Sequence, residues 1–302
     1  MGNLDRALVS LQDQGRVSVD SQIHPRIGML NFWPWIVAAG AFAAWFSHRY
    51  AWWSLTVSWA HPRILMYHMI SRPVRGARYN SMRVSPENFE YQLKWLKDHG
   101  FEFLTMADIA KGVPRERVVV LTFDDGFEDN YTAAFPLLKK YGARATLYLV
   151  AERDDGRDWS AQKKAHHNSG ELLREAKLSD EQVREMVNSG VFELGAHTMT
   201  HVNLSKASLE EKRSEIIGSK TALENQFGAA VTSFAYPFGI WDQQDRDVVE
   251  EGGFISAVTT DRGVTSYPYK DALELKRIKV SGKEGMYSFQ LRLRTGQRSL
   301  WK

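Results

Sequence analysis

Short apolar runs alternate with longer amphipathic segments over most of the chain. The runs have the length of buried parallel strands, and the segments between them begin at polar caps or end at glycines, as helices do. This alternation predicts an α/β domain. We expect strands at 63–70, 101–104, 117–121, 145–150, from 191, 234–239, 254–260 and 275–280, and helices at 85–100, 106–111, 129–142, 179–190, 209–228 and 245–252.

One segment near the start, residues 27–47, is apolar and carries no charged residue. About twenty residues at about 1.5 Å each match the hydrocarbon core of a membrane, and tryptophans near both ends suit its interfaces. We therefore expect a transmembrane or interfacial anchor helix at 27–60, between a polar segment at 1–26 and a folded domain at 61–302. A helix packed on that domain stays open, because Pro34 and two other residues weaken the span.

Composition removes several classes of protein. The chain of 302 residues has no cysteine, so a disulfide framework and a thiolate metal site are both excluded. Its formal net charge of only +3 argues against a general binder of polyanions, and we expect no nucleic-acid partner.

Two adjacent aspartates, Asp124 and Asp125, follow the apolar run at 117–121. Gly126 then lets the backbone turn sharply. Enzymes with parallel sheets place their chemistry at the carboxyl ends of strands, so the pair is a candidate site. A plain Asp-Asp-Gly turn is the alternative interpretation.

A second apolar run ends in His197 and His201, which are four residues apart. If the chain turns helically there, both imidazoles lie on one face. Two histidines and one carboxylate are a usual ligand set for a catalytic Zn²⁺, although Fe(II) sites use the same types. Such groups, half buried together, would stay poorly solvated or repel one another without a cation, which favours a metal site over surface histidines.

Together with a third motif at Phe234–Gly239, the motifs Thr122–Gly126 and His197–His201 have a known order and spacing. The chain resembles the polysaccharide deacetylases of the NodB-like group, carbohydrate esterase family four, over roughly residues 61–282. The resemblance implies a distorted (β/α) barrel, a divalent metal, usually zinc, and the removal of N-acetyl groups from amino sugars. The positions that match the family's metal ligands are Asp125, His197 and His201, and the position that matches its general base is Asp124.

The third motif is implied to line the site at Tyr236 and Pro237, with the Tyr236 amide as a donor to the oxyanion. Two positions depart from the family. Where the family often carries an arginine that orients the base, this chain has Ala235, and Arg277 is a candidate replacement. The family's last motif lacks its usual histidine here, so His68 is our candidate for the general acid.

The segment from Glu152 to Lys177 is charged and lacks clear periodicity. Loops of this length usually have a function or are disordered. We expect a substrate-binding loop in which Trp159 stacks on a sugar ring, and a solvated insertion is the equal alternative.

These observations predict metal-dependent hydrolysis of N-acetyl groups on a bacterial envelope or secreted polysaccharide, with release of acetate. A deacetylase or deformylase of a lipid-linked amino sugar and an inactive glycan-binding scaffold stay open, although the intact motifs argue against the scaffold. By analogy with the family, we expect a single-pass protein of the bacterial inner membrane whose catalytic domain is extracytoplasmic. The charges that flank the anchor segment do not determine its orientation.

Overall fold

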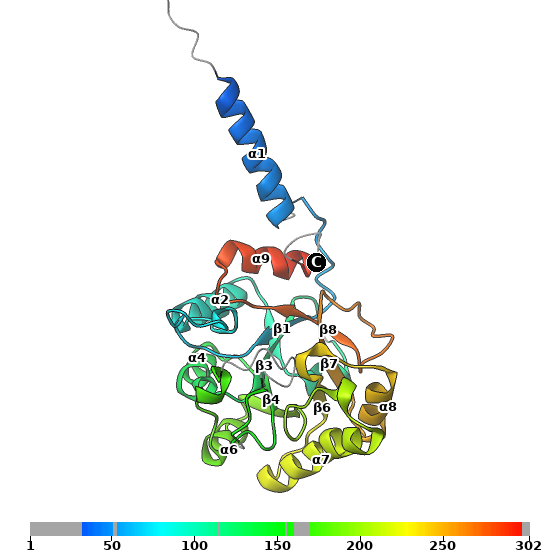
Figure 1. Cartoon of the computed structure of the whole chain (residues 1–302). Coiled ribbons are helices and arrows are strands. Elements are labelled where there is room, and N and C mark those ends of the chain that lie inside the picture. The colour runs from blue at the N-terminus through cyan, green and yellow to red at the C-terminus, as the bar shows by residue number, and fades with distance from the viewer. Residues whose placement is uncertain (1–31, 51–52, 114, 155, 160–169, 298–302) are drawn as a thin grey trace, which may run out of the picture. The chain divides into compact units, whose positions relative to one another are not determined.

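The computed structural model describes residues 32–50, 53–113, 115–154, 156–159 and 170–297. These residues divide into two units at the boundary between Ala44 and Trp45. The first unit holds most of helix α1 (Trp33–Tyr50), and the second holds all the other helices and strands (Figure 1).

Helix α1 lies within the predicted anchor segment and exposes large apolar side chains such as Trp33, Trp35 and Phe42. Residues 27–31 of that segment lie outside the described part of the chain. No helix among the described residues has both the length and the apolar character needed to cross a membrane. The predicted transmembrane helix is therefore not supported, and the membrane location with an extracytoplasmic domain stays a prediction.

The second unit is built on a closed ring of parallel strands, which confirms the predicted barrel. Strand β1 pairs with both β8 and β3, and the other strands follow in the order β8, β7, β6, β5, β4 and β3, so seven strands close the ring. The strands are β1 (Arg63–Tyr67), β2 (Glu102–Leu104), β3 (Val118–Asp125), β4 (Ala145–Leu149), β5 (Phe192–Ala196), β6 (Ser233–Ala235), β7 (Ser256–Arg262) and β8 (Leu275–Lys279).

The irregular part of the barrel is at β3. Strand β2 pairs with Val118–Val120 and β4 pairs with Leu121–Asp125, so these two strands share successive halves of one edge of β3. The opposite edge pairs with β1. Because β3 is longer than its neighbours and buried along its whole length, it carries its last two residues to the carboxyl end of the barrel.

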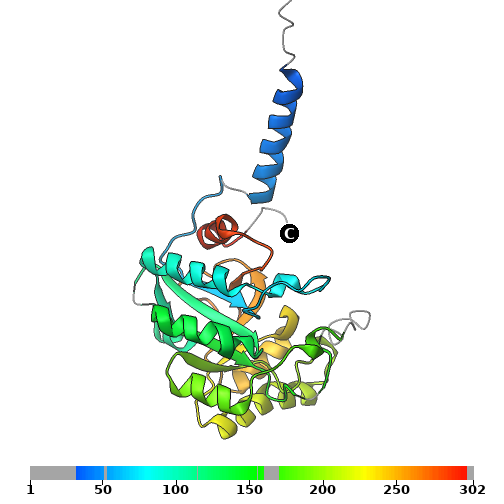
Figure 2. The ribbon, with the colours of Figure 1, turned by 90° about the vertical axis from the view of Figure 1, so that its left-hand side faces the viewer.

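Helices cover the outside of the strands, as Figures 1 and 2 show. They are α2 (Pro86–Asp98), α4 (Phe135–Tyr141), α6 (Asp180–Asn188), α7 (Leu209–Phe227), α8 (Gln243–Glu251) and α9 (Met286–Thr295). One more helix, α3 (Met106–Lys111), packs against the cluster inside the ring. Several begin at the capping boxes that their sequences predict, for example with Ser179 before α6 and Ser208 before α7. The helix expected at 129–142 has a π-helical first part, η2 (Asn130–Ala134), followed by α4.

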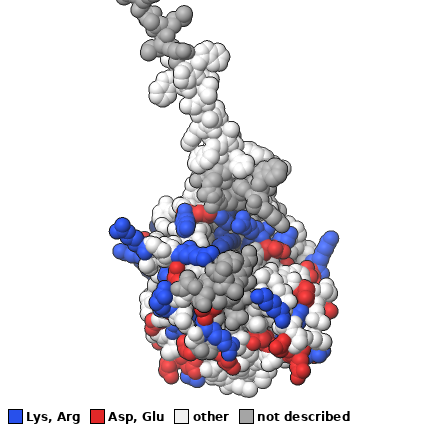
Figure 3. All heavy atoms as spheres, in the orientation of Figure 1, with Lys and Arg blue, Asp and Glu red and all other residues white. Residues whose placement is uncertain are grey.

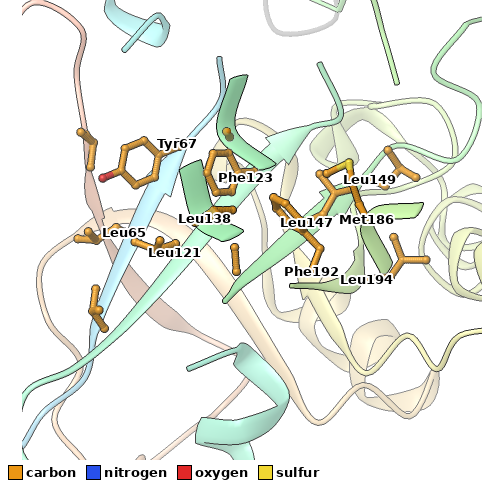
Figure 4. Close-up of a cluster of buried hydrophobic side chains, with 14 of the residues drawn as sticks. Leu65, Tyr67, Leu121, Phe123, Leu138, Leu147, Leu149, Met186, Phe192 and Leu194 are labelled. Carbon is orange, nitrogen blue, oxygen red and sulfur yellow. The ribbon is translucent and has the colours of Figure 1, made fainter. Parts of the chain in front are cut away.

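Alternation along the strands produces two separate apolar cores. Outward positions such as Leu121, Phe123, Leu147 and Leu149 pack under α4 and α6, where Leu138 and Met186 meet them (Figure 4). Inward positions form a smaller cluster inside the ring, which includes Val120, Tyr148 and Leu275. A one-residue change of register would exchange the two sets, so the pattern fixes which side chains face the interior.

Helix α3 closes the amino end of the ring. Its Met106 and Ile109 pack into the inner cluster, and its first turn binds polar groups inside the barrel. The Met106 amide donates to Thr146 Oγ1 at 3.0 Å, and the Ala107 amide donates to Glu193 Oε2 at 2.9 Å. With this end filled, the opposite, carboxyl end is left for a site.

Candidate active site at the carboxyl end of the barrel

The two aspartates end β3 in a strained backbone. Asp125 and Gly126 both have φ of 79°, a left-handed conformation that costs energy for a residue with a Cβ atom. A Cβ atom on residue 126 would also collide with the Leu149 side chain, so any other residue there would be strained and would displace that side chain. This turn directs Asp124 into the ring and holds Asp125 at its mouth, and both carboxylates are buried.

Asp125 meets both motif histidines. Its Oδ1 atom lies 3.4 Å from His197 Nε2 and 3.3 Å from His201 Nε2. A tetrahedral ion with bonds of about 2.0–2.1 Å holds neighbouring ligand atoms about 3.3–3.4 Å apart, so the three groups fit a Zn²⁺-like ion. Among the described residues, this is the one set of three metal-binding side chains. Burial alone would raise the pKa of Asp125, but the two imidazoles outweigh it and hold this pKa well below its usual value.

The chain between the two histidines is not the helical turn that their spacing suggested. Residues 197–201 form an irregular loop in which Thr198 and His201 have positive φ angles of 67° and 56°. The Thr198 hydroxyl donates to the His197 carbonyl and accepts from the His201 amide at 3.0 Å. The two imidazoles converge because this hydrogen-bonded loop folds back on itself. The expected helical turn was therefore wrong, although the expected meeting of the two rings is confirmed.

Asp124 is held by an arginine of β8, which lies next but one to β3 in the ring. Arg277 Nη1 and Nη2 donate to its two carboxylate oxygens at 2.7 and 2.8 Å. The same guanidinium donates to Thr122 Oγ1 and to the Thr259 carbonyl. Burial would raise the pKa of Asp124, but the charge and hydrogen bonds of Arg277 lower it, so the carboxylate stays ionised. Arg277 therefore makes the contact with Asp124 that was expected of it as the replacement for an arginine at position 235.

A pocket of about 380 Å³ opens above these groups. His68 lines it at the end of β1, as the sequence suggested. Burial lowers the pKa of His68, and the charges of Asp125 and Asp124 oppose this effect. A neutral imidazole at this place can donate a hydrogen bond from one ring nitrogen and accept one at the other, and it must take up a proton before it can act as an acid.

Tyr236 lines the pocket as expected, but its amide and Trp159 do not take their predicted parts. The Tyr236 amide donates to the Val258 carbonyl at 3.2 Å, because β6 continues its pairing by one residue, so this amide is not available to an oxyanion. Pro237 follows it, is buried and has no amide hydrogen. Trp159 is only 2% exposed and stacks on His201, so it presents no free face to a sugar ring. Residues 160–169 of the predicted substrate-binding loop lie outside the described part of the chain.

Sequence reasoning missed two cations of the pocket. Lys279 and Arg262 line it at the ends of β8 and β7. Lys279 could have been found, since it is two positions after Arg277 and inward positions recur every second residue.

In the space-filling view, Lys and Arg side chains are more frequent on the upper part of the second unit, and Asp and Glu are more frequent toward its lower rim (Figure 3).

Comparisons with known proteins find relatives of this chain. A sequence profile described as polysaccharide deacetylase matches residues 111–256. The Bacillus subtilis (strain 168) protein named "Putative polysaccharide deacetylase YxkH" is 32% identical over 234 residues, which cover 76% of this chain and 75% of that protein. A poly-β-1,6-N-acetyl-D-glucosamine N-deacetylase of Staphylococcus aureus (strain MRSA252) is 30% identical over 182 residues, 56% of this chain and 58% of that enzyme. The match thus spans less than two thirds of the staphylococcal enzyme.

Solved structures give the same picture. The Streptococcus pyogenes deacetylase PplD in complex with acetate superposes with a TM-score of 0.64 at 28% identity, over 78% of this chain and 98% of that one. BC0361, a polysaccharide deacetylase from Bacillus cereus, superposes with a TM-score of 0.65 at 29% identity, over 78% and 69% of the two chains.

Proposed function

Because the chain belongs to the polysaccharide deacetylase family, we propose that it removes N-acetyl groups from the amino sugars of a bacterial polysaccharide, using a divalent metal ion at Asp125, His197 and His201. Zn²⁺ is the expected ion for one carboxylate and two imidazoles. The observation that carries the proposal is the second carboxylate, Asp124, which is buried beside this cluster and ionised through Arg277. It is the base that hydrolysis needs.

The reaction divides among the residues of the pocket as follows. A divalent ion held by Asp125, His197 and His201 would supply Lewis acidity for the acetamide carbonyl and for the attacking water. Asp124 accepts a proton from that water, and Arg277 keeps the carboxylate oriented. The water oxygen bonds to the carbonyl carbon, the carbon–nitrogen bond breaks, and the amine leaves with one added proton. His68 lines the pocket and, once it has taken up a proton, would be the acid that supplies it to the amine.

Poly-β-1,6-N-acetyl-D-glucosamine is the first substrate to test, because the Staphylococcus aureus relative is named for it. Acetate release from this polymer and from chitin oligosaccharides would be measured with the purified chain loaded with Zn²⁺. The Asp124→Asn variant should lose about 10²–10⁴-fold in turnover, since that is what a general base contributes, and it should keep its metal. His68→Ala should also slow turnover at unchanged metal content.

Asp247→Asn is the matched control, because it changes an exposed aspartate of α8 and should leave turnover unchanged. Full activity of Asp124→Asn would remove this residue as the base. No acetate from any N-acetylated glycan, with metal bound, would contradict the proposed function.

A further inference from the structure

The two metal-binding histidines are oriented by different means. His197 Nδ1 lies 2.7 Å from the Ala235 carbonyl oxygen, which can only accept, so the proton is on Nδ1 and Nε2 faces Asp125. Metal-binding histidines usually have such a partner, which fixes both tautomer and ring plane. His201 is different, because its Nδ1 atom is buried without a hydrogen-bond partner among the described residues.

Aromatic packing takes the place of that missing hydrogen bond. The Trp159 ring stacks on the His201 imidazole, with centroids 5.1 Å apart and planes inclined by 26°. Phe238 meets the same imidazole edge to face, at 4.5 Å and 80°. A ring held by one stacked and one perpendicular neighbour has little freedom to rotate about its Cβ–Cγ bond. This freedom decides whether Nε2 points at Asp125.

The indole is itself fixed in place. Lys177 Nζ lies 4.8 Å from the Trp159 ring centroid and 4.6 Å from the Phe127 ring centroid, within the range of cation–π contacts. The same ammonium donates to the Leu172 and Glu175 carbonyls at 2.9 and 2.7 Å. A β-bridge between Phe127 and Lys177 ties the group to the end of β3.

We propose that Trp159, backed by Lys177, is a positioning residue that orients the His201 imidazole for metal binding. The inference rests on the proposed metal site, and it assigns the tryptophan a role in metal affinity rather than in sugar binding. Loss of an outer partner of a metal-binding histidine typically costs about 10–100-fold in metal affinity. We expect removal of the indole to lower the metal affinity by a factor in this range.

The test compares Trp159→Leu, which keeps apolar bulk but has no flat face, with Trp159→Phe, which keeps a ring that can stack. Zn²⁺ affinity of each full-length variant would be measured by competition with a chromophoric chelator, and folding by circular dichroism. Trp159→Leu should bind Zn²⁺ about 10–100-fold more weakly, and Trp159→Phe should stay close to the wild type. Lys177→Met should weaken binding less than Trp159→Leu does.

The chain offers a matched control in Trp95, which stacks on His99 at 3.8 Å and 21° on the surface of α2. Trp95→Leu removes the same kind of pair and should leave Zn²⁺ affinity unchanged. If Trp159→Leu binds Zn²⁺ as tightly as the wild type, or Trp159→Phe binds as weakly as Trp159→Leu, the positioning role is wrong and the proposed function stands. If His201→Ala binds Zn²⁺ like the wild type, the metal site itself is wrong and both proposals fall.

Discussion

Two fully buried arginines in the same barrel have opposite kinds of partner. Arg63, at the start of β1, donates to four backbone carbonyls at 2.5–2.8 Å, those of Val57, Ser58, His61 and Leu293. Arg277, in β8, instead donates to both oxygens of one carboxylate. Neither side chain is more than 1% exposed, so burial does not distinguish them.

The different acceptors indicate that Arg63 has a structural role and Arg277 a role in the reaction. Carbonyl dipoles do not neutralise the charge of Arg63, and burial lowers its pKa to about 10. In return, the guanidinium ties residues 57–61 and the end of α9 to the first strand. The charge of Arg277 is instead neutralised by the Asp124 carboxylate, and this pair ties no backbone segments together through that carboxylate. We infer that one arginine holds chain segments together and the other keeps a reactive group in its working state.

The largest effect that would test this contrast is expected at Arg277. Arg277→Ala leaves Asp124 buried and unpaired, which raises its pKa and frees its orientation, so turnover should fall about 10²–10³-fold. Arg277→Lys should recover only part of this, because an ammonium cannot donate bidentately. Acetate release would be measured beside metal content, which should stay at the wild-type level in both variants.

Normal turnover of the Arg277→Ala variant would contradict the different roles assigned to Arg63 and Arg277, because Arg277 would then have only a structural role. A loss of bound metal in the same variant would mean that Arg277 supports the ligands as well as the base.

A smaller and opposite effect is expected at Arg63. Arg63→Met keeps the apolar stem but leaves four carbonyls without their donor, so the free energy of unfolding should fall by about 2–4 kcal/mol. Turnover per folded molecule should not change, because the side chain lies at the amino end of β1. Urea denaturation would give the stability, and acetate release at low temperature the turnover.

Arg63→Lys is the useful companion, since one ammonium can satisfy only some of the four carbonyls and should give an intermediate stability. If Arg63→Met loses turnover at full stability, the division between the two arginines is wrong.

Much of the site could be predicted because its residues follow local rules. Asp124 and Asp125 stand at the end of an apolar run, and buried parallel strands have a recognisable length. Arg277 was predicted as the partner of Asp124 because Ala235 stands where the family often has an arginine. Lys279 follows from the same alternation of inward positions, although the sequence analysis did not use it.

Other parts of the site depend on tertiary detail that no local pattern carries. Whether the Tyr236 amide is available depends on β6 pairing one residue further with its neighbour, which the sequence of β6 does not specify. Trp159 belongs to a long segment without periodicity, so its burial against His201 follows from contacts with residues far away in the chain. The loop between the histidines depends on a left-handed threonine, a conformation that propensities disfavour.

A third buried arginine, Arg83, extends the comparison to a place where carboxylates outnumber the cation. It pairs with Glu175 and also approaches Glu171, and Asp129 lies close enough to feel its charge. Burial raises the pKa of Asp129 from 3.8 to about 6, against opposing hydrogen bonds from Ile70 and Ser71.

The folded state therefore holds the Asp129 proton more tightly than the unfolded state does. This contribution to stability is complete below about pH 4 and is lost as the pH rises through about 6. Asp129→Asn should abolish the loss, so the variant should gain about 1–2 kcal/mol on the wild type between pH 4 and pH 7, after discounting for partial exposure. Unfolding by urea across this range would measure the gain, with the exposed Asp261→Asn as control. If Asp129→Asn and wild type follow parallel curves, Arg83 satisfies all its carboxylates at once, and the excess of acid around it has no energetic consequence.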